Sequence, residues 1–259
     1  MDARCCISAA ATPNSSGESP SGAVLTPARR RGREILDDPS IDPAVRARSM
    51  GDIIRANRWL GGLRAALVEI RDSLAGLPSG ATLLDVGTGL GDIPHRAALD
   101  AERTGKTLTT IALDGARTLL AAARMRGSEA VCADALALPF RDDSIDVVCC
   151  SQLLHHFDTD DAERVLRELN RVARHAVVVS DLRRSWLAMA GFWLVSFPLR
   201  FSPVTRHDGS LSVLRGFTSR ELEALVLRAT GVRPVVHRRL GFRLTARWTP
   251  VSQDARLAA

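Results

Sequence analysis

The chain has 259 residues, of which 46% are hydrophobic and 25% are charged, and its formal net charge is +6. That balance is typical of a globular protein and leaves room for one large α/β domain with additions. Lys106 is the only lysine, so the basic charge comes almost entirely from arginine. We attribute this bias to a coding sequence rich in G and C rather than to a nucleic-acid-binding surface. Tyrosine is absent, which excludes a phenol side chain as acid or base.

The five cysteines form no C-x-x-C pair, so the sequence indicates neither a zinc cluster nor a disulfide framework. Three of them, Cys132, Cys149 and Cys150, fall in predicted core strands, where a free thiol behaves as a small hydrophobe. A reducing cytoplasm is the simplest compartment for such thiols. The N-terminus lacks the apolar h-region of a secretory signal.

Residues 1–33 are rich in Ala, Ser, Pro and Gly and end in a cluster of arginines. No hydrophobic periodicity supports a packed element here, so we predict a disordered tail. Its arginines either contact an anionic surface or are simply solvated, and we favour the second interpretation.

From Ile41 to Leu77 the apolar residues recur at helical spacing. Asp42 is a natural N-cap, because a proline follows it at the first helical position. The pair Gly61-Gly62 predicts a break between two helices. We therefore expect residues 34–78 to form N-terminal helices.

The stretch from Leu83 to Asp92, LLDVGTGLGD, predicts a buried strand, a glycine turn and the start of a helix. Glycine allows a sharp turn and a close approach of the backbone to a ligand. A turn of this kind forms a crevice at the carboxyl end of a parallel sheet, where an adenosyl cofactor is the usual occupant. In the dinucleotide-binding pattern G-x-G-x-x-G, a third glycine would stand at Asp92. A carboxylate there, together with Asp85, suits a ligand with an ammonium and a sulfonium group and without phosphates.

At these residues the sequence resembles the class I S-adenosylmethionine (SAM)-dependent methyltransferases, whose first motif is a strand ending in an acidic residue followed by G-x-G-x-G. The resemblance covers about residues 80 to 248. It implies an α/β, Rossmann-like fold with a seven-stranded, mostly parallel sheet, a C-terminal antiparallel hairpin and N-terminal cap helices. The methyltransferase domain would span 79–250, with the helices of 34–78 covering the cofactor. Arg55, Asn57 and Arg58 would then either face the site or lie on a solvated face.

Two further strands end in acidic residues. Leu108 to Leu113 is followed by Asp114, which we expect to accept hydrogen bonds from ribose hydroxyls, to cap the next helix, or to do both. The strand from Ala130 is followed by Asp134 and Ala135. The resemblance implies that these two contact adenine, through a carboxylate and a backbone N–H.

The fourth strand, Ile145 to Cys150, leads into Ser151 and then His155-His156. In the resembled family its carboxyl end faces the transferred methyl group. Imidazole titrates near neutral pH, so either histidine could remove a proton from an acceptor hydroxyl. The alternative is that one of them packs or caps the following helix. The predicted cofactor-binding residues are Asp85, Gly87, Thr88, Gly89, Gly91, Asp114, Asp134, Ala135 and Ser151.

Between the fifth strand and the last crossover helix we predict a substrate-binding insertion at 182–217. The apolar run from Trp186 to Leu199 is too short to span a bilayer, which needs about 20 residues. It predicts a buried helix or a lid over a lipophilic pocket, with peripheral membrane contact as a further interpretation. A polar loop is expected at 206–210. His207 and Trp186 are the predicted substrate-binding residues.

These features predict a methyltransferase that transfers the methyl group of SAM to a hydroxyl or carbon of a hydrophobic or aromatic small molecule, such as a quinone or polyketide. The acceptor is not expected to be a nucleic acid, because the Asn/Asp-Pro-Pro-aromatic tetrad of amino-methylating nucleic-acid enzymes is missing after the fourth strand. No clustered ligand spacing predicts a metal. The alternatives are a nicotinamide-dependent oxidoreductase and a non-catalytic SAM-binding protein.

Overall fold

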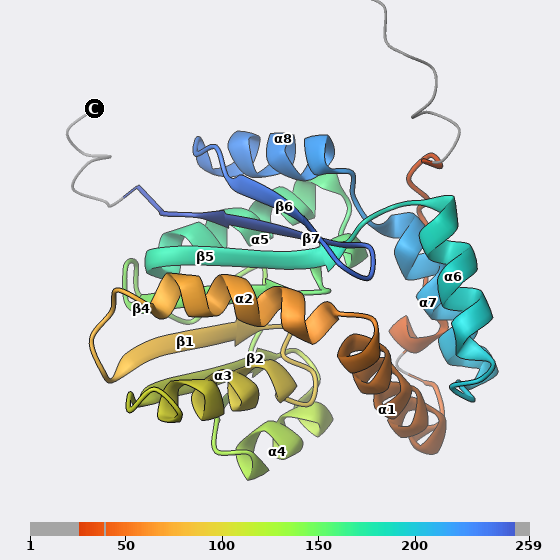
Figure 1. Ribbon diagram of the computed structural model, residues 1–259, viewed down its shortest axis with the longest axis horizontal. Coiled ribbons are helices and arrows are strands. Elements are labelled where there is room, and N and C mark those ends of the chain that lie inside the picture. Colours follow the sequence, from red (N-terminus) through yellow and green to blue (C-terminus); the bar gives the residue numbers. More distant parts are fainter. Residues whose placement is uncertain (1–25, 39, 252–259) are drawn as a thin grey trace, which may run out of the picture.

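The computed structural model describes residues 26–38 and 40–251 and contains one seven-stranded sheet with the order β3-β2-β1-β4-β5-β7-β6 (Figure 1). The first five strands are parallel, whereas β7 is antiparallel to β5 and β6 is antiparallel to β7. This arrangement confirms the predicted fold class and its terminal hairpin. The strands are β1 (Ala81–Val86), β2 (Leu108–Asp114), β3 (Glu129–Cys132), β4 (Ile145–Ser151), β5 (Ala173–Leu182), β6 (Val235–Arg239) and β7 (Arg243–Trp248).

Helices cover both faces of the sheet, which explains why the central strands are apolar almost throughout. On β1, Leu83 packs in the core with α2 and α3, whereas its neighbour Leu84 packs in the opposite core with α5 and α8. Val147 and Val148 on β4 divide in the same way. The helices are η2 (Ile35–Asp37), α1 (Pro43–Trp59), α2 (Gly62–Leu74), α3 (Asp92–Glu102), α4 (Arg117–Met125), η3 (Leu154–His156), α5 (Thr159–Val172), α6 (Trp186–Ser196), α7 (Pro203–Arg215) and α8 (Ser219–Thr230).

Helix ends follow the local capping chemistry. The Asp42 carboxylate accepts from two backbone N–H groups at the start of α1, as predicted. Thr218 and Glu221 form a reciprocal capping box at the start of α8. Helix α5 begins at Thr159, where the carboxylate of the N-cap Asp158 accepts from the Asp161 N–H.

Helices α1, α6 and α7 gather beyond the carboxyl ends of the parallel strands (Figure 1). A buried carboxylate joins α1 to α7: Asp52 of α1 accepts hydrogen bonds from the N–H of Ser202, the N-cap of α7 (2.8 Å), and from the hydroxyl of Thr205 in its first turn (3.0 Å). This layer therefore stands over the edge of the sheet where the glycine turn lies.

The structure differs from the prediction at the end of the N-terminal tail. Residues 26–33 do not lie free but run along the end of α7. The Arg30 N–H donates to the Leu214 carbonyl (3.1 Å), and the Pro27 carbonyl accepts from Arg184 Nε (2.8 Å). The guanidinium of Arg29 stacks on the Phe217 ring at 4.3 Å. The remainder of the predicted tail, residues 1–25, lies outside the described residues.

The predicted polar loop at 206–210 is wrong, because this segment lies inside α7. Ser202 caps the helix ahead of a proline, and the polar residues that indicated a loop serve tertiary contacts instead. Asp208 accepts from the Ile35 and Leu36 N–H groups, both at 2.9 Å. A Cβ at Gly209 would lie 2.2 Å from the Phe192 ring, so this glycine lets α6 and α7 approach closely.

The apolar helix α6 is not a buried helix. It buries only Ala188 and Ser196, while Leu187, Trp193 and Leu194 are each more than half exposed. Of the two predicted interpretations, burial in a core is therefore wrong, and a cover at the edge of the sheet remains. None of the helices in 26–38 and 40–251 is long and apolar enough to cross a membrane.

Candidate active site

The glycine turn after β1 is held against β2. The N–H groups of Gly87 and Thr88 both donate to the Leu113 carbonyl, and the Gly89 N–H donates to the Asp114 carboxylate at 2.9 Å. Gly87 and Gly89 have φ of 73° and 57°, a left-handed conformation that L side chains rarely adopt. The other Asp114 oxygen accepts from the Ala116 N–H (2.8 Å). Asp114 thus fixes both the turn and the entry to α4.

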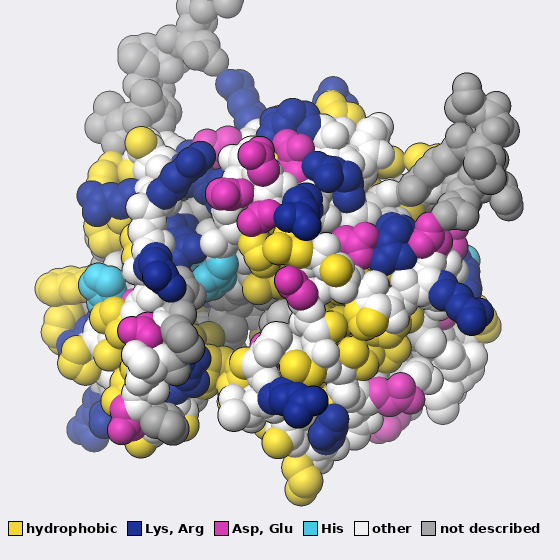
Figure 2. Space-filling view, turned by 180° about the vertical axis from the view of Figure 1, so that it is seen from behind, with side chains coloured by type: hydrophobic (Ala, Val, Ile, Leu, Met, Phe, Trp, Pro, Cys, Tyr) yellow, Lys and Arg dark blue, Asp and Glu magenta, His cyan; other side chains and the backbone are white. Residues whose placement is uncertain are grey.

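A cavity opens at the carboxyl ends of β1, β4 and β5, between the turn and the layer of α1, α6 and α7. Figure 2 shows the surface hollowed beside a histidine side chain on this face. Its walls combine a polar floor with an apolar cover. The floor includes Asp85, Thr88, Asp92, Asp114, Ser151, Gln152 and His155, and the cover includes Met50, Ile53, Ile54, Leu182, Phe192 and Val213.

Buried polar atoms without hydrogen-bond partners gather in this cavity. They include both carboxylate oxygens of Asp85, Thr88 Oγ1, Ser151 Oγ and His155 Nε2. Buried polar groups in proteins are nearly always satisfied, so a cluster of exceptions indicates a ligand-binding surface. Acceptors at Asp85 match the ammonium group of an amino acid. The residues present therefore fit S-adenosylmethionine, whose methionine moiety carries that group.

The Asp85 carboxyl is almost completely buried. Burial raises its pKa to about 7, and the negative charges of Asp92 and Asp114 add to the effect. Burial also raises the pKa of Asp92. A cationic group beside these carboxyls would favour their ionised forms, which is the charge complementarity expected for an ammonium or sulfonium ligand.

A second hollow adjoins the first and shares Gly87 and Asp114 with it. Asp134 and Ala135, the residues expected to contact adenine, line this second hollow. The structure thus brings eight of the nine predicted cofactor residues together along one continuous surface. Gly91 is the exception: its missing Cβ would meet Ala123 of α4 at 2.8 Å, so it serves helix packing rather than the cavity.

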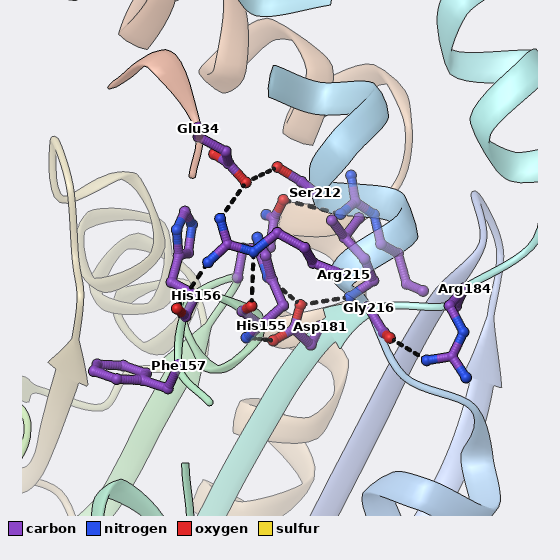
Figure 3. Close-up of polar contacts among 12 residues, drawn as sticks. Glu34, His155, His156, Phe157, Asp181, Arg184, Ser212, Arg215 and Gly216 are labelled. Carbon is purple, nitrogen blue, oxygen red and sulfur yellow. Dashed lines mark hydrogen bonds and ion pairs between the residues drawn. The ribbon is translucent and has the colours of Figure 1, made fainter. Parts of the chain in front are cut away.

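His155 is held by an aspartate that the sequence analysis did not select. Asp181, at the end of β5, accepts from the His155 backbone N–H (3.1 Å) and lies 2.7 Å from His155 Nδ1 (Figure 3). Both side chains are buried. Burial alone would raise the pKa of Asp181, but His155 and the Leu182 N–H hold it below its ordinary value. Because a carboxylate only accepts, Nδ1 donates to Asp181, and Nε2 is the unpartnered ring nitrogen of a residue that lines the cavity.

An arginine holds the backbone of both histidines. Arg215 Nε donates to the His155 carbonyl (3.1 Å) and Nη2 to the His156 carbonyl (2.7 Å), while Nη1 pairs with Glu34 at 3.5 Å (Figure 3). The Ser212 hydroxyl also donates to Glu34 (2.6 Å). Glu34, His155 and His156 have potential metal-ligating atoms within 4.8 Å of one another. The Arg215 cation already compensates the Glu34 charge, which disfavours a metal ion there.

The two predicted substrate residues do not reach the cavity. His207 points outward, with a side chain 57% exposed, and pairs with Asp208 at 2.8 Å. Trp186 is 39% exposed at the start of α6. Asn57 does line the cavity, whereas Arg55 and Arg58 are exposed. Phe192, Gln152 and Arg243 line it without having been selected.

Comparisons with known proteins agree with this geometry. Residues 84–179 match the family model of a methyltransferase domain. The chain is similar to tRNA (carboxymethyluridine(34)-5-O)-methyltransferase alkbh8 of Xenopus tropicalis, with 35% identity over 107 residues, 41% of this chain and 16% of that protein. It is 31% identical over 106 residues to the probable tRNA methyltransferase 9B of Homo sapiens, 41% of this chain and 21% of that protein. The match thus spans less than a quarter of either relative.

Solved structures share the fold over most of the chain. The plantazolicin methyltransferase BpumL superimposes with a TM-score of 0.63 and 14% identity, covering 81% of this chain and 92% of that one. A SAM-dependent methyltransferase from Aquifex aeolicus gives a TM-score of 0.57 and 17% identity, covering 82% and 100%. At these identities the likeness concerns the fold.

The sheet order, the glycine turn and the matched model define a class of domain: residues 84–179 carry a methyltransferase domain, on the class I fold whose cofactor is SAM. Both the predicted family and the predicted cofactor are thereby confirmed.

Proposed function

We propose that the chain transfers the methyl group of SAM to a hydroxyl of a hydrophobic or aromatic small molecule, with His155 as the general base. The observation that carries this proposal is the buried His155–Asp181 pair, with Nδ1 and the carboxylate 2.7 Å apart and Nε2 unpartnered at the cavity wall. Such a pair fixes the tautomer and orientation of the imidazole.

In the proposed mechanism the acceptor hydroxyl lies against Nε2. When bound, SAM supplies an activated methyl group. His155 removes the hydroxyl proton as the oxygen attacks, and the ionised Asp181 stabilises the imidazolium that forms. Asp85, Thr88, Asp114, Asp134 and Ser151 are the residues proposed to hold the cofactor. The apolar cover of the cavity excludes water and aligns the acceptor.

The cover supports a hydrophobic acceptor. Met50, Ile53 and Ile54 on α1 and Phe192 on α6 face the cavity, an environment that favours apolar and aromatic surface. On its other side α6 exposes Leu187, Trp193 and Leu194. We propose that α6 contacts a membrane surface peripherally and that the acceptor reaches the cavity from that surface.

A second candidate function is methylation of RNA. Its support is the tRNA-modifying activity named for the two curated relatives, and a basic opening that adjoins His155 and His156. Arg29, Arg30, Arg31, Arg33 and Arg215 line this opening. Arginine clusters of this kind attract phosphates. We favour the small molecule because the cavity itself is covered by apolar side chains.

The test is transfer of labelled methyl from SAM to two sets of acceptors, phenols and quinols on one side and unmodified total tRNA on the other. His155→Gln and Asp181→Asn should each lower kcat about a hundredfold or more for a hydroxyl acceptor, with unchanged SAM affinity. His207→Gln, at an exposed position outside the cavity, is the matched control and should behave as wild type. Full activity of both variants would refute a base at His155. Methylation of tRNA without methylation of the phenols and quinols would favour the second candidate. Tight binding of NADH would support the alternative of a nicotinamide-dependent oxidoreductase.

A further inference from the structure

A buried arginine stands in the wall of the cavity without a counter-charge. Arg243, the first residue of β7, is only 4% exposed and lines the cavity together with Gln152 and Asn57. Its Nη1 donates to Gln152 Oε1 (2.9 Å) and its Nη2 lies 3.5 Å from Asn57 Oδ1. Both partners are neutral amides. Its Nε has no hydrogen-bond partner among the described residues.

This arrangement is costly for the folded protein. No acidic side chain within 26–38 and 40–251 lies at ion-pair distance from Arg243, and Asp181, whose negative charge acts on Arg243 from further away, is engaged by His155. Burial accordingly lowers the pKa of Arg243 to about 10. A buried charge without a partner is strongly unfavourable, so proteins seldom retain one unless a ligand completes it.

The surroundings hold the guanidinium in place. Gln152 Nε2 donates to Asn57 Oδ1 at 2.6 Å, which joins the two amides into one support. Gln152 itself has a φ of 53°, a strained conformation for a residue with a side chain. Gly62 underlies the group, since a Cβ there would lie 2.9 Å from Asn57 Oδ1 and 3.3 Å from the Arg243 guanidinium carbon. Two of the five guanidinium N–H groups are thus committed to the amides, and the others remain for a ligand.

We infer that Arg243 is a carboxylate-binding residue of this cavity. A planar guanidinium matches the two oxygens of a carboxylate, and the opposite charge of Asp85 lies in the same cavity. The cavity therefore presents an anionic and a cationic group together, as a zwitterionic amino acid requires. The carboxylate comes either from the methionine moiety of the cofactor or from an acid group on the acceptor. The inference rests on SAM as cofactor and does not depend on His155 acting as a base.

Calorimetric titrations of wild type, Arg243→Gln and Arg243→Lys distinguish the two sources. The probes are S-adenosylhomocysteine, which has the amino acid group, and methylthioadenosine, which lacks it. If the cofactor supplies the carboxylate, Arg243→Gln weakens S-adenosylhomocysteine at least tenfold and leaves methylthioadenosine unchanged, and Arg243→Lys restores part of the loss. If the acceptor supplies it, S-adenosylhomocysteine affinity is unchanged. Salicylate then binds the S-adenosylhomocysteine complex of Arg243→Gln at least tenfold more weakly than that of wild type. Neutral salicylamide binds both complexes with the same affinity.

Unchanged affinities for S-adenosylhomocysteine and salicylate would overturn the inference. If wild-type protein does not bind S-adenosylhomocysteine, both the cofactor assignment and the carboxylate-binding role of Arg243 are overturned. If His155→Gln does not change turnover, only the proposed base is refuted, and the role of Arg243 is unaffected. Thermal unfolding of ligand-free Arg243→Met separates a binding role from a structural one. We expect an equal or higher Tm than wild type, because an unpaired buried charge is removed. A clear decrease in Tm together with unchanged ligand affinities would make Arg243 structural.

Discussion

Replacing Asp85 by asparagine should change how stability depends on pH. The folded-state pKa of about 7 lies far above the ordinary 3.8, because burial penalises the charged carboxylate. At 1.36 kcal/mol per pKa unit the difference corresponds to about 4 kcal/mol, which the ionised group costs the ligand-free protein above pH 7. As the pH falls below 7, the folded state binds the proton first, and the cost declines until the unfolded chain is also protonated near pH 4.

Urea unfolding of ligand-free wild type and Asp85→Asn at pH 8 and pH 5 measures this effect. The stability of Asp85→Asn relative to wild type should fall by about 3 kcal/mol between pH 8 and pH 5. Because the amide also alters local packing, the change with pH is the test and the absolute difference is not. S-adenosylhomocysteine should bind the variant more weakly, since the ammonium group loses its counter-charge. A stability difference that is the same at both pH values would refute a raised pKa at Asp85.

Three further substitutions separate binding from packing. Asp114→Ala should weaken SAM affinity at least about tenfold through lost hydrogen bonds to a charged group, and unchanged affinity in a folded protein would contradict the ribose assignment. Gly91→Ala should destabilise by about 2 kcal/mol more than Gly105→Ala in thermal unfolding, because both glycines have φ near 72° but only Gly91 faces a neighbouring backbone atom, at 2.9 Å. Equal losses would argue against tight α3–α4 packing. Thr218→Ala should cost about 1 kcal/mol of unfolding free energy by removing the α8 capping box, with unchanged SAM affinity.

The sheet and its central turn could be predicted because their signals are local. Strands buried on both faces need continuous apolar residues, and β1 and β4 supply them. The turn needs glycines at left-handed positions, and the residues after β1 supply those as well. The capping box of α8 likewise lies within four consecutive residues, Thr218 to Glu221. Each of these features depends on residues that are close together in the sequence, so a single sequence is enough to predict it.

The prediction of a polar loop at 206–210 was wrong because the structure of this segment depends on distant partners. Asp208 and Gly209 suggest a loop, yet within α7 the first caps the backbone of Ile35 and Leu36 and the second accommodates Phe192. Asp181 was missed for a different reason. It follows the apolar run of β5 as Asp114 follows that of β2, so the same rule of acidic residues at strand ends would have selected it.

The charges of the cavity are arranged so that they cannot satisfy one another. Asp85 lies under the glycine turn and Arg243 is held by Gln152 and Asn57, and no ion pair joins them within the described chain. Had they met, a ligand with both charges would have to break their bond before binding. Because the two groups are kept apart, each of them destabilises the ligand-free protein, and a bound ligand of opposite charge removes that destabilisation. On the proposal that one ligand carries both charges, the same unpaired groups that destabilise the ligand-free protein increase its selectivity for that ligand, which is the usual relation between stability and function at a binding site.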